Sequence, residues 1–174
     1  LIDAGTSVKG VALGMQVGDT GDAYHWHPLY TAGGGYLFGR DQQGAPDPDD
    51  LGVGTPGSVQ VGVRLHDLAD AGLVRADQSR QVLEKAFTLG KLAWWITGQW
   101  SVPTATDAGI DLMVCPVPTW SDGAPSQPLV GVQALFLSSA AQNPELATDF
   151  LTHYATGEEF QDGMMASGRP PARK

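Results

Sequence analysis

A continuous hydrophobic stretch from Leu92 to Thr97, reading LAWWIT, gives this chain its clearest structural signal. An unbroken apolar run of this length is typical of a strand that is buried on both faces of a parallel sheet. Gly98 ends the run, and Gln99 and Trp100 follow directly. We therefore predict an inner strand, with Trp100 just past its carboxyl end, where open α/β sheets bind their ligands.

Apolar strand-like runs and helix-like periodic segments alternate along the rest of the chain. This alternation predicts an α/β fold, with a mostly parallel central sheet and helices over both of its faces. Further strands are expected at 11–17, 36–38, 112–117 and 129–137. Helices are expected to begin near Asp22, at Pro56, near Asp77, at Pro144 and at a capping box formed by Thr156 and Glu159. The proline- and aspartate-rich stretch 40–54 is expected to be a loop.

Composition narrows the range of functions. The chain has 174 residues, which suits a single domain, and its net charge is −9. Nucleic acid and anionic membrane surfaces are disfavoured as partners, because both attract basic proteins. No apolar run approaches the roughly 20 residues that a membrane span needs, so any targeting segment is expected to lie outside this stretch of sequence.

Residue types that bind metals or act as nucleophiles are present, but their spacing is unfavourable. Cys115 lies in the run LMVCPVP, which predicts a buried strand and favours an inert thiol over a catalytic one. His25 and His27 resemble zinc ligands, yet on a helix residues two apart point about 200° apart. The acidic stretch 46–50 lacks the ligand spacing of a calcium loop. We expect neither a metal nor a cofactor.

The sequence favours ligand binding over catalysis. A sugar hydrolase needs two carboxyl groups on opposite sides of the scissile bond, and only Asp22 lies among aromatic neighbours. No phosphate-binding loop, nucleophile elbow or dinucleotide-binding pattern is present. A carbohydrate-active enzyme domain, another small-solute-binding lobe and a plain interaction domain stay open as alternatives.

The candidate site combines aromatic rings with one acid. Asp22, Tyr24 and, as a third member, Trp26 follow one predicted strand, and Trp100 follows another. An aromatic ring offers a flat apolar face and a carboxylate accepts hydrogen bonds from hydroxyl groups, so the set suits a carbohydrate. The competing interpretation is that Trp100 belongs to the core, because tryptophan is mostly buried on average.

The order of the motifs resembles the extracellular solute-binding proteins of carbohydrate ABC transporters, in particular the maltose and maltodextrin-binding branch. The resemblance covers roughly residues 12 to 172. Its marks are DAYHWHPLYTAGGGYLFG (22–39), DLGVGTPGSVQVGVRLHDLADAGLV (50–74), LEKAFTLGKLAWWITGQW (83–100), CPVPTW (115–120), PSQPLVGVQALFLSSAAQNPELATDFLTHYAT (125–156) and GRPPA (168–172).

The resemblance assigns roles to individual residues. It implies that Asp22 and Tyr24 contact the sugar and that Trp100 stacks on a sugar ring. Gln133, in the VGVQ segment, is a weaker candidate from its position alone. Ala23 departs from the pattern, because the maltose-binding sequences carry proline there.

The resemblance also predicts the domain organisation, the partners and the location of the protein. Residues 1–174 would form a single lobe, similar to the second lobe of a type II periplasmic-binding-protein fold, without the first lobe and the C-terminal helices. The full-length protein would be a monomeric, non-enzymatic component of an ABC sugar importer that binds maltose- or maltodextrin-like oligosaccharides and meets membrane permease subunits. Its location would be extracellular or periplasmic, with a lipoprotein tether.

Overall fold

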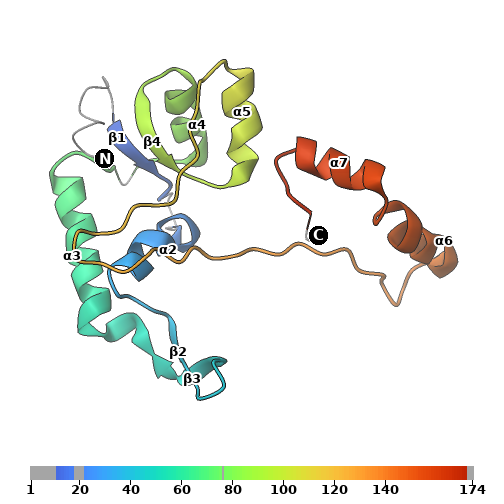
Figure 1. The fold of residues 1–174 in the computed structure, drawn as a ribbon, viewed down its shortest axis with the longest axis horizontal. Helices are drawn as coiled ribbons and strands as arrows, with labels where there is room; N and C mark the ends of the chain where they lie inside the picture. Colours follow the sequence, from blue (N-terminus) through green and yellow to red (C-terminus); the bar gives the residue numbers. More distant parts are fainter. Residues whose placement is uncertain (1–10, 18–21, 76, 172–174) are drawn as a thin grey trace.

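A parallel pair of strands organises the fold. The structure, a computed structural model, describes residues 11–17, 22–75 and 77–171. Strand β1 (Val11–Met15) pairs in parallel with β4 (Leu92–Ile96), and Met15 lies opposite Ile96, so both strands end at the same edge of the sheet (Figure 1). The segment after α3 runs along the other side of β1, because the Leu13 amide donates to the Leu73 carbonyl at 3.2 Å.

Helices cover both faces of this small sheet, as the sequence predicts. Helix α4 (Arg80–Thr88) packs on one face, where the Phe87 and Trp95 rings lie 5.5 Å apart. Helices α2 (Ala23–Ala32) and α3 (Pro56–Asp70) pack on the other face, through Leu29 of α2 and Leu65 and Leu68 of α3. The core there is built around three buried residues, Met15, Leu29 and Val74. The predicted α/β class is confirmed.

Helix starts follow from local capping chemistry. The Thr55 side chain accepts from the Ser58 amide, and Pro56 supplies a fixed φ at the first helical position of α3. Helix α4 begins three residues later than expected, because Ser79 is its N-cap and the Asp77 carboxylate is held by Arg75 instead. Helix α5 (Val102–Asp107) follows the short helix η2 (Gln99–Ser101).

Strand β4 is not an inner strand in the described residues, which contradicts the prediction. It pairs with β1 alone, and the segment 112–117, expected as a strand, has no strand pairing in the described structure. That segment is separated from β4 by an apolar cavity of about 880 Å³. Only Leu92 of the strand is fully buried, and Cys115, expected in the core, is exposed.

The stretch 40–54, expected to be a loop, contains a strand. Strands β2 (Phe38–Arg40) and β3 (Pro46–Leu51) form an antiparallel hairpin. Its turn is fixed by Asp41, whose carboxylate accepts from the amides of Gln43 and Ala45, and the following η1 turn (Gly52–Gly54) leads into α3. Prolines are tolerated in β3 because the hairpin is an exposed ribbon of two edge strands.

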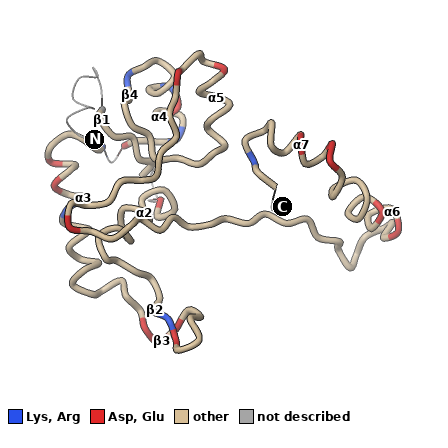
Figure 2. Tube along the Cα trace, viewed as in Figure 1, with Lys and Arg blue, Asp and Glu red and all other residues tan. Residues whose placement is uncertain are grey.

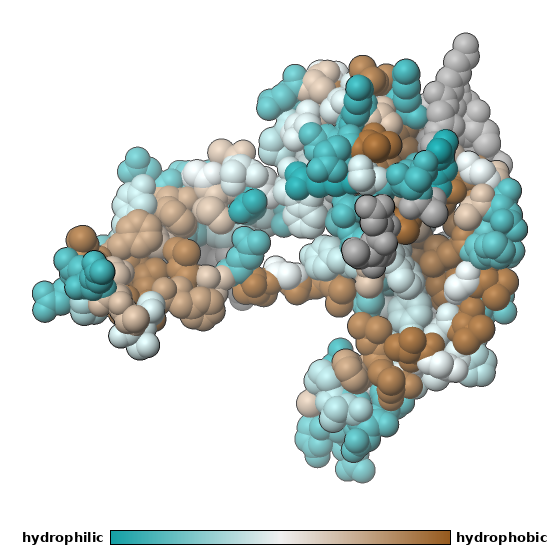
Figure 3. Space-filling model, turned by 180° about the vertical axis from the view of Figure 1, so that it is seen from behind, coloured by the Kyte–Doolittle hydropathy of each residue, from teal (hydrophilic) through white to brown (hydrophobic). Residues whose placement is uncertain are grey.

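The segment 129–137, expected as a strand, is an extended connection without strand pairing in the described structure. It leads to α6 (Pro144–Asp149), a π-helical turn η3 (Phe150–Tyr154) and α7 (Glu158–Ala166), of which α6 lies farthest from the sheet (Figure 1). Hydrophobic residues lie along the connection (Figure 3). Val130, Val132 and Phe136 are 85%, 78% and 86% exposed.

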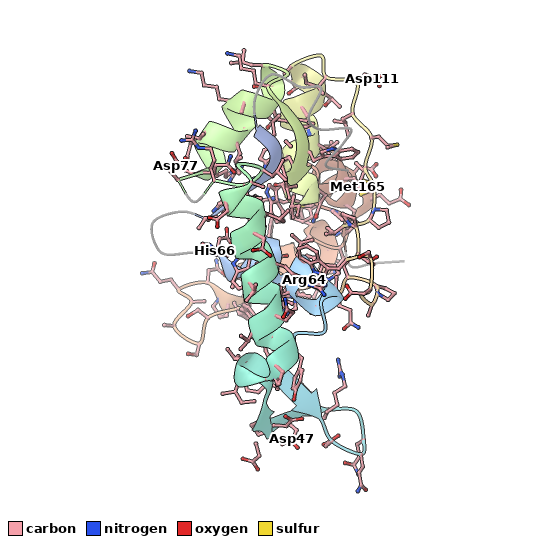
Figure 4. The ribbon with its side chains drawn as sticks, turned by 90° about the vertical axis from the view of Figure 1, so that its left-hand side faces the viewer. Asp47, Arg64, His66, Asp77, Asp111 and Met165 are labelled. Atoms are coloured by element: carbon pink, nitrogen blue, oxygen red, sulfur yellow. The ribbon has the colours of Figure 1, made fainter. Side chains whose placement is uncertain are left out.

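The turn 120–124 is tied to the helical layer by Arg64. The guanidinium of Arg64, labelled on the α3 helix in Figure 4, donates two hydrogen bonds to Asp122, at 2.8 and 2.7 Å. It also lies 5.5 Å from the centre of the Trp120 ring. The Trp120 indole N–H donates to the Leu29 carbonyl at 2.8 Å, which connects the turn to α2.

This ion pair predicts a pH-dependent contribution to stability. Hydrogen bonding to Arg64 holds the pKa of Asp122 below its usual value. A lowered pKa means stabilisation that is present above the ordinary aspartate pKa and is lost as the pH falls through the folded-state value. We expect Asp122→Asn to lower the urea midpoint slightly at neutral pH and to have no effect in strong acid. A difference that persists unchanged in acid would show that the ion pair is not its source.

Charged groups are spread over the described surface. Figure 2 shows basic residues at scattered positions on separate elements, in a chain with 10 Lys and Arg against 19 Asp and Glu. Among the helices of the described ranges, none is long and apolar enough to cross a bilayer.

Candidate functional site

The N-terminus of α2 holds the predicted acid. Asp22 is the N-cap, and its Oδ1 accepts from the amides of Tyr24 and His25 at 3.1 and 3.3 Å. Its Oδ2 lies 2.7 Å from His25 Nδ1. Aspartate at an N-cap satisfies amides that lack a helical partner, so this local chemistry fixes the first turn and the side chains that it carries.

Trp100 is positioned by the turn that ends β4. Its six-membered ring lies against Gly98, where a Cβ would overlap the ring, so the GQW turn needs glycine for this close approach. The Thr97 and Ser101 hydroxyls are 2.9 Å apart, and the Ser101 amide donates to the Gly98 carbonyl at 3.1 Å. These bonds hold Trp100 at the carboxyl end of β4.

Three rings meet at this edge of the sheet. The Tyr24 and Trp100 centroids are 6.2 Å apart with a 39° tilt. The His25 ring lies 5.6 Å from Tyr24 and 6.0 Å from Trp100, roughly edge-on to both. Tyr24 is 39% exposed and Trp100 is partly exposed. We call Asp22, Tyr24, His25 and Trp100 the aromatic cluster.

Two other parts of the chain border the cluster. The extended connection passes beside Tyr24, since a Cβ at Gly131 would stand 3.4 Å from the tyrosine hydroxyl. The end of α7 reaches the Trp100 turn, where a Cβ at Gly168 would stand 2.8 Å from the Gln99 carbonyl oxygen. The sequence motifs VGVQ and GRPP therefore both approach this edge.

The structure brings together three of the four predicted site residues. Asp22, Tyr24 and Trp100 are in the cluster, but Gln133 is exposed on the connection, two residues beyond Gly131. Trp26, the further candidate, packs against the core around Met15, Leu29 and Val74 and is not in the cluster. The geometry agrees with the expected placement at the carboxyl ends of two strands. Ligand contact by these residues stays a prediction.

His25 is the cluster member that the sequence did not select. Its i+3 spacing from the cap Asp22 was the available signal, because residues that far apart on a helix are neighbours. His27 faces elsewhere, with its Nδ1 3.1 Å from the Gln127 carbonyl oxygen. The two imidazoles thus have different partners. In the described ranges, no group of three or more His, Cys, Asp or Glu side chains is placed to hold a metal ion.

The large apolar cavity adjoins the turn that carries Trp100, because Gly98, Gln99 and Ser101 line it, but no member of the aromatic cluster does. Its lining includes β4 and the segment 110–120, and Trp94 and Trp95 line it, whereas Tyr24 and Trp100 do not. A ligand pocket usually combines an apolar lining with a few convergent polar groups. This cavity lies where a neighbouring strand would complete the sheet, so we interpret it as unfilled core.

Comparison with known proteins identifies relatives of the chain. All of it, residues 1–174, matches the family described as bacterial extracellular solute-binding protein. The galactooligosaccharide-binding protein of Bacillus subtilis (strain 168) is 28% identical over 155 residues, which cover 87% of this chain and 37% of that protein. The maltodextrin-binding protein MdxE of the same organism is 27% identical over 153 residues, covering 86% of this chain and 36% of that protein.

These matches confirm the family resemblance inferred from the motifs. The chain spans little more than a third of the length of either relative. Because the family match extends over every residue, this chain belongs to the bacterial extracellular solute-binding proteins.

Proposed function

We propose that this chain is the sugar-binding lobe of the substrate-binding component of an ABC sugar importer, and that it binds maltose- or maltodextrin-like oligosaccharides. The observation that carries the proposal is the pair of partly exposed rings, Tyr24 and Trp100, beside the Asp22 carboxylate at the carboxyl edge of the sheet. Tilted aromatic rings present apolar faces on which a sugar ring stacks.

The relatives support oligosaccharide as the ligand class. One is named for galactooligosaccharides and the other for maltodextrins. Calorimetric titration of the full-length protein with maltose, longer glucans and galactooligosaccharides tests the proposal. Binding of glucans in preference to galactooligosaccharides is the expected result. Preference for galactooligosaccharides would keep the sugar-binding role and reject the maltodextrin assignment, and binding of no sugar would reject the role.

Binding without turnover is the activity that the site supports. Glycoside hydrolysis uses two carboxyl groups about 5 to 9 Å apart across the substrate. In the described part of the cluster, Asp22 is the acid present, and it is engaged by a backbone cap and by His25. We expect the oligosaccharide to be recovered unchanged after long incubation, as measured by mass spectrometry. Appearance of shortened sugars would favour the enzyme alternative.

The exposed apolar segments support the proposal that residues 1–174 are one lobe of a two-lobe protein. The connection 129–137 is apolar at most positions of both faces, as in a strand buried inside a sheet. Monomeric soluble proteins rarely expose large contiguous apolar patches. A first lobe, supplied by the rest of the full-length protein, would cover the connection. The partners would then be permease subunits at the outer face of the membrane, with a lipoprotein tether holding the monomer there.

The one-lobe arrangement predicts weak binding by the isolated chain. Solute-binding proteins with two lobes close around the ligand by a hinge motion, and on the one-lobe proposal the contacts from the first lobe would be absent from the isolated chain. Each loss of about 1.4 kcal/mol weakens affinity tenfold, so we expect at least a hundredfold weaker binding than in the full-length protein. Calorimetry on both forms measures this, with circular dichroism as a control for folding. Equal affinity would show that this lobe alone is sufficient.

A further inference from the structure

The Asp22 carboxylate has little capacity left for a ligand. A carboxylate offers about four lone-pair positions. Here Oδ1 accepts from two backbone amides and Oδ2 is held 2.7 Å from His25 Nδ1. The side chains of His25 and Asp22 are only 13% and 15% exposed. The family resemblance implies that this acid contacts the sugar, whereas in the structure its hydrogen bonds are to groups of the protein itself.

His25 connects the carboxylate to both rings of the cluster. An ionised carboxylate can only accept hydrogen bonds, so His25 Nδ1 carries the proton and donates to Oδ2. That bond fixes the imidazole plane, which stands at 73° to the Tyr24 ring and at 87° to the Trp100 ring. Edge-to-face contacts at these separations are favourable and depend on orientation. The position of the imidazole therefore restricts both rings.

We propose that Asp22 and His25 form a brace behind the sugar platform, in which Asp22 orients His25 and His25 orients Tyr24 and Trp100. Both are positioning residues, and the rings are the sugar contacts. The inference rests on the proposed sugar-binding function. Its physical basis is preorganisation: rings already held in the binding orientation lose less freedom when the ligand arrives.

A double-mutant cycle on the full-length protein tests the brace. Asp22→Asn keeps a good N-cap but removes the ionised partner of His25. His25→Phe keeps a flat ring and removes Nδ1. We expect each variant to weaken oligosaccharide binding about tenfold, and the double variant to be no weaker than either alone, because the two residues act in series. Multiplied losses would show that Asp22 acts on the sugar directly and would overturn the brace.

A spectroscopic measurement separates positioning from general stability. The fluorescence of Trp100, obtained by subtracting the Trp100→Phe spectrum, should change in both single variants before sugar is added. Ser79→Ala, which removes the cap of α4 away from the cluster, should lower the urea midpoint and leave the Trp100 signal and the affinity unchanged. An unchanged Trp100 signal in both brace variants would contradict the proposal.

The sugar-binding function and the Asp22–His25 brace are rejected by different results. If the wild-type protein binds no oligosaccharide, the proposed function fails, whatever the variants do. If the wild type binds and the Asp22 and His25 losses multiply, only the brace fails. Should Asp22→Asn unfold, Asp22→Ser, which also keeps a capping oxygen, replaces it in the cycle.

Discussion

Trp100→Ala in the full-length protein should weaken oligosaccharide binding at least about tenfold, or about 1.4 kcal/mol, with little loss of stability. The indole stands past the carboxyl end of β4 and packs on the Gly98 backbone. Its removal therefore takes away a stacking surface and leaves the sheet intact. Calorimetric titration with sugar and urea melts measure the two effects separately.

Trp94→Ala is the matched control, because Trp94 lies in the strand that leads to Trp100. Trp94 lies within β4, opposite Leu13, and lines the apolar cavity. Truncating a buried aromatic residue costs about 3 to 5 kcal/mol, and we expect the lower end because Trp94 is only half-buried. The folded fraction of the Trp94→Ala variant should bind sugar with normal affinity. If Trp100→Ala binds normally and melts early instead, Trp100 is a core residue and the site loses its central ring.

Local sequence signals were sufficient to predict the segments that carry Asp22 and Trp100. The helix start near Asp22, the strand expected at 92–97 and Gly98, which ends that strand, are short-range signals, and each placed its segment correctly. The meeting of Asp22 and Trp100 followed from one topological rule, that parallel strands end at a common edge. The contact of His25 with Trp100 joins residues 75 positions apart in sequence, so its i+3 spacing from Asp22 alone could not predict its place in the cluster.

The failed strand predictions have a common physical cause. The strand predictions at 112–117 and 129–137 rested on their apolar runs, but a strand also needs a neighbour that completes its hydrogen bonds. In the described structure, these segments have no strand neighbour. The hairpin at 38–51 is the opposite case. There the turn at Asp41 brings β2 and β3 together, and β3 pairs although its prolines and aspartates have low strand propensity.

The connection 129–137 gives the sharpest test of the one-lobe proposal. Val132→Lys should be nearly neutral for the stability of the isolated chain, within about 0.5 kcal/mol, because Val132 is 78% exposed there. It should also reduce aggregation, since a charge on an unpaired apolar strand blocks edge-to-edge pairing. In the full-length protein the same lysine would be buried inside a sheet without a partner, so we expect a loss of at least about 3 kcal/mol.

Urea melts and light scattering on both forms measure these effects, and Gln142→Lys provides the control. Gln142 is exposed just beyond the connection, so its replacement should be neutral in both forms. For Val132→Lys, the change in the free energy of unfolding is compared between the isolated chain and the full-length protein. Subtracting one from the other cancels any intrinsic effect of the lysine on the unfolded chain. A large difference means that a first lobe covers Val132. A lysine that is neutral in the full-length protein as well would mean that the connection stays exposed there, and the exposed apolar segment would no longer support a two-lobe protein.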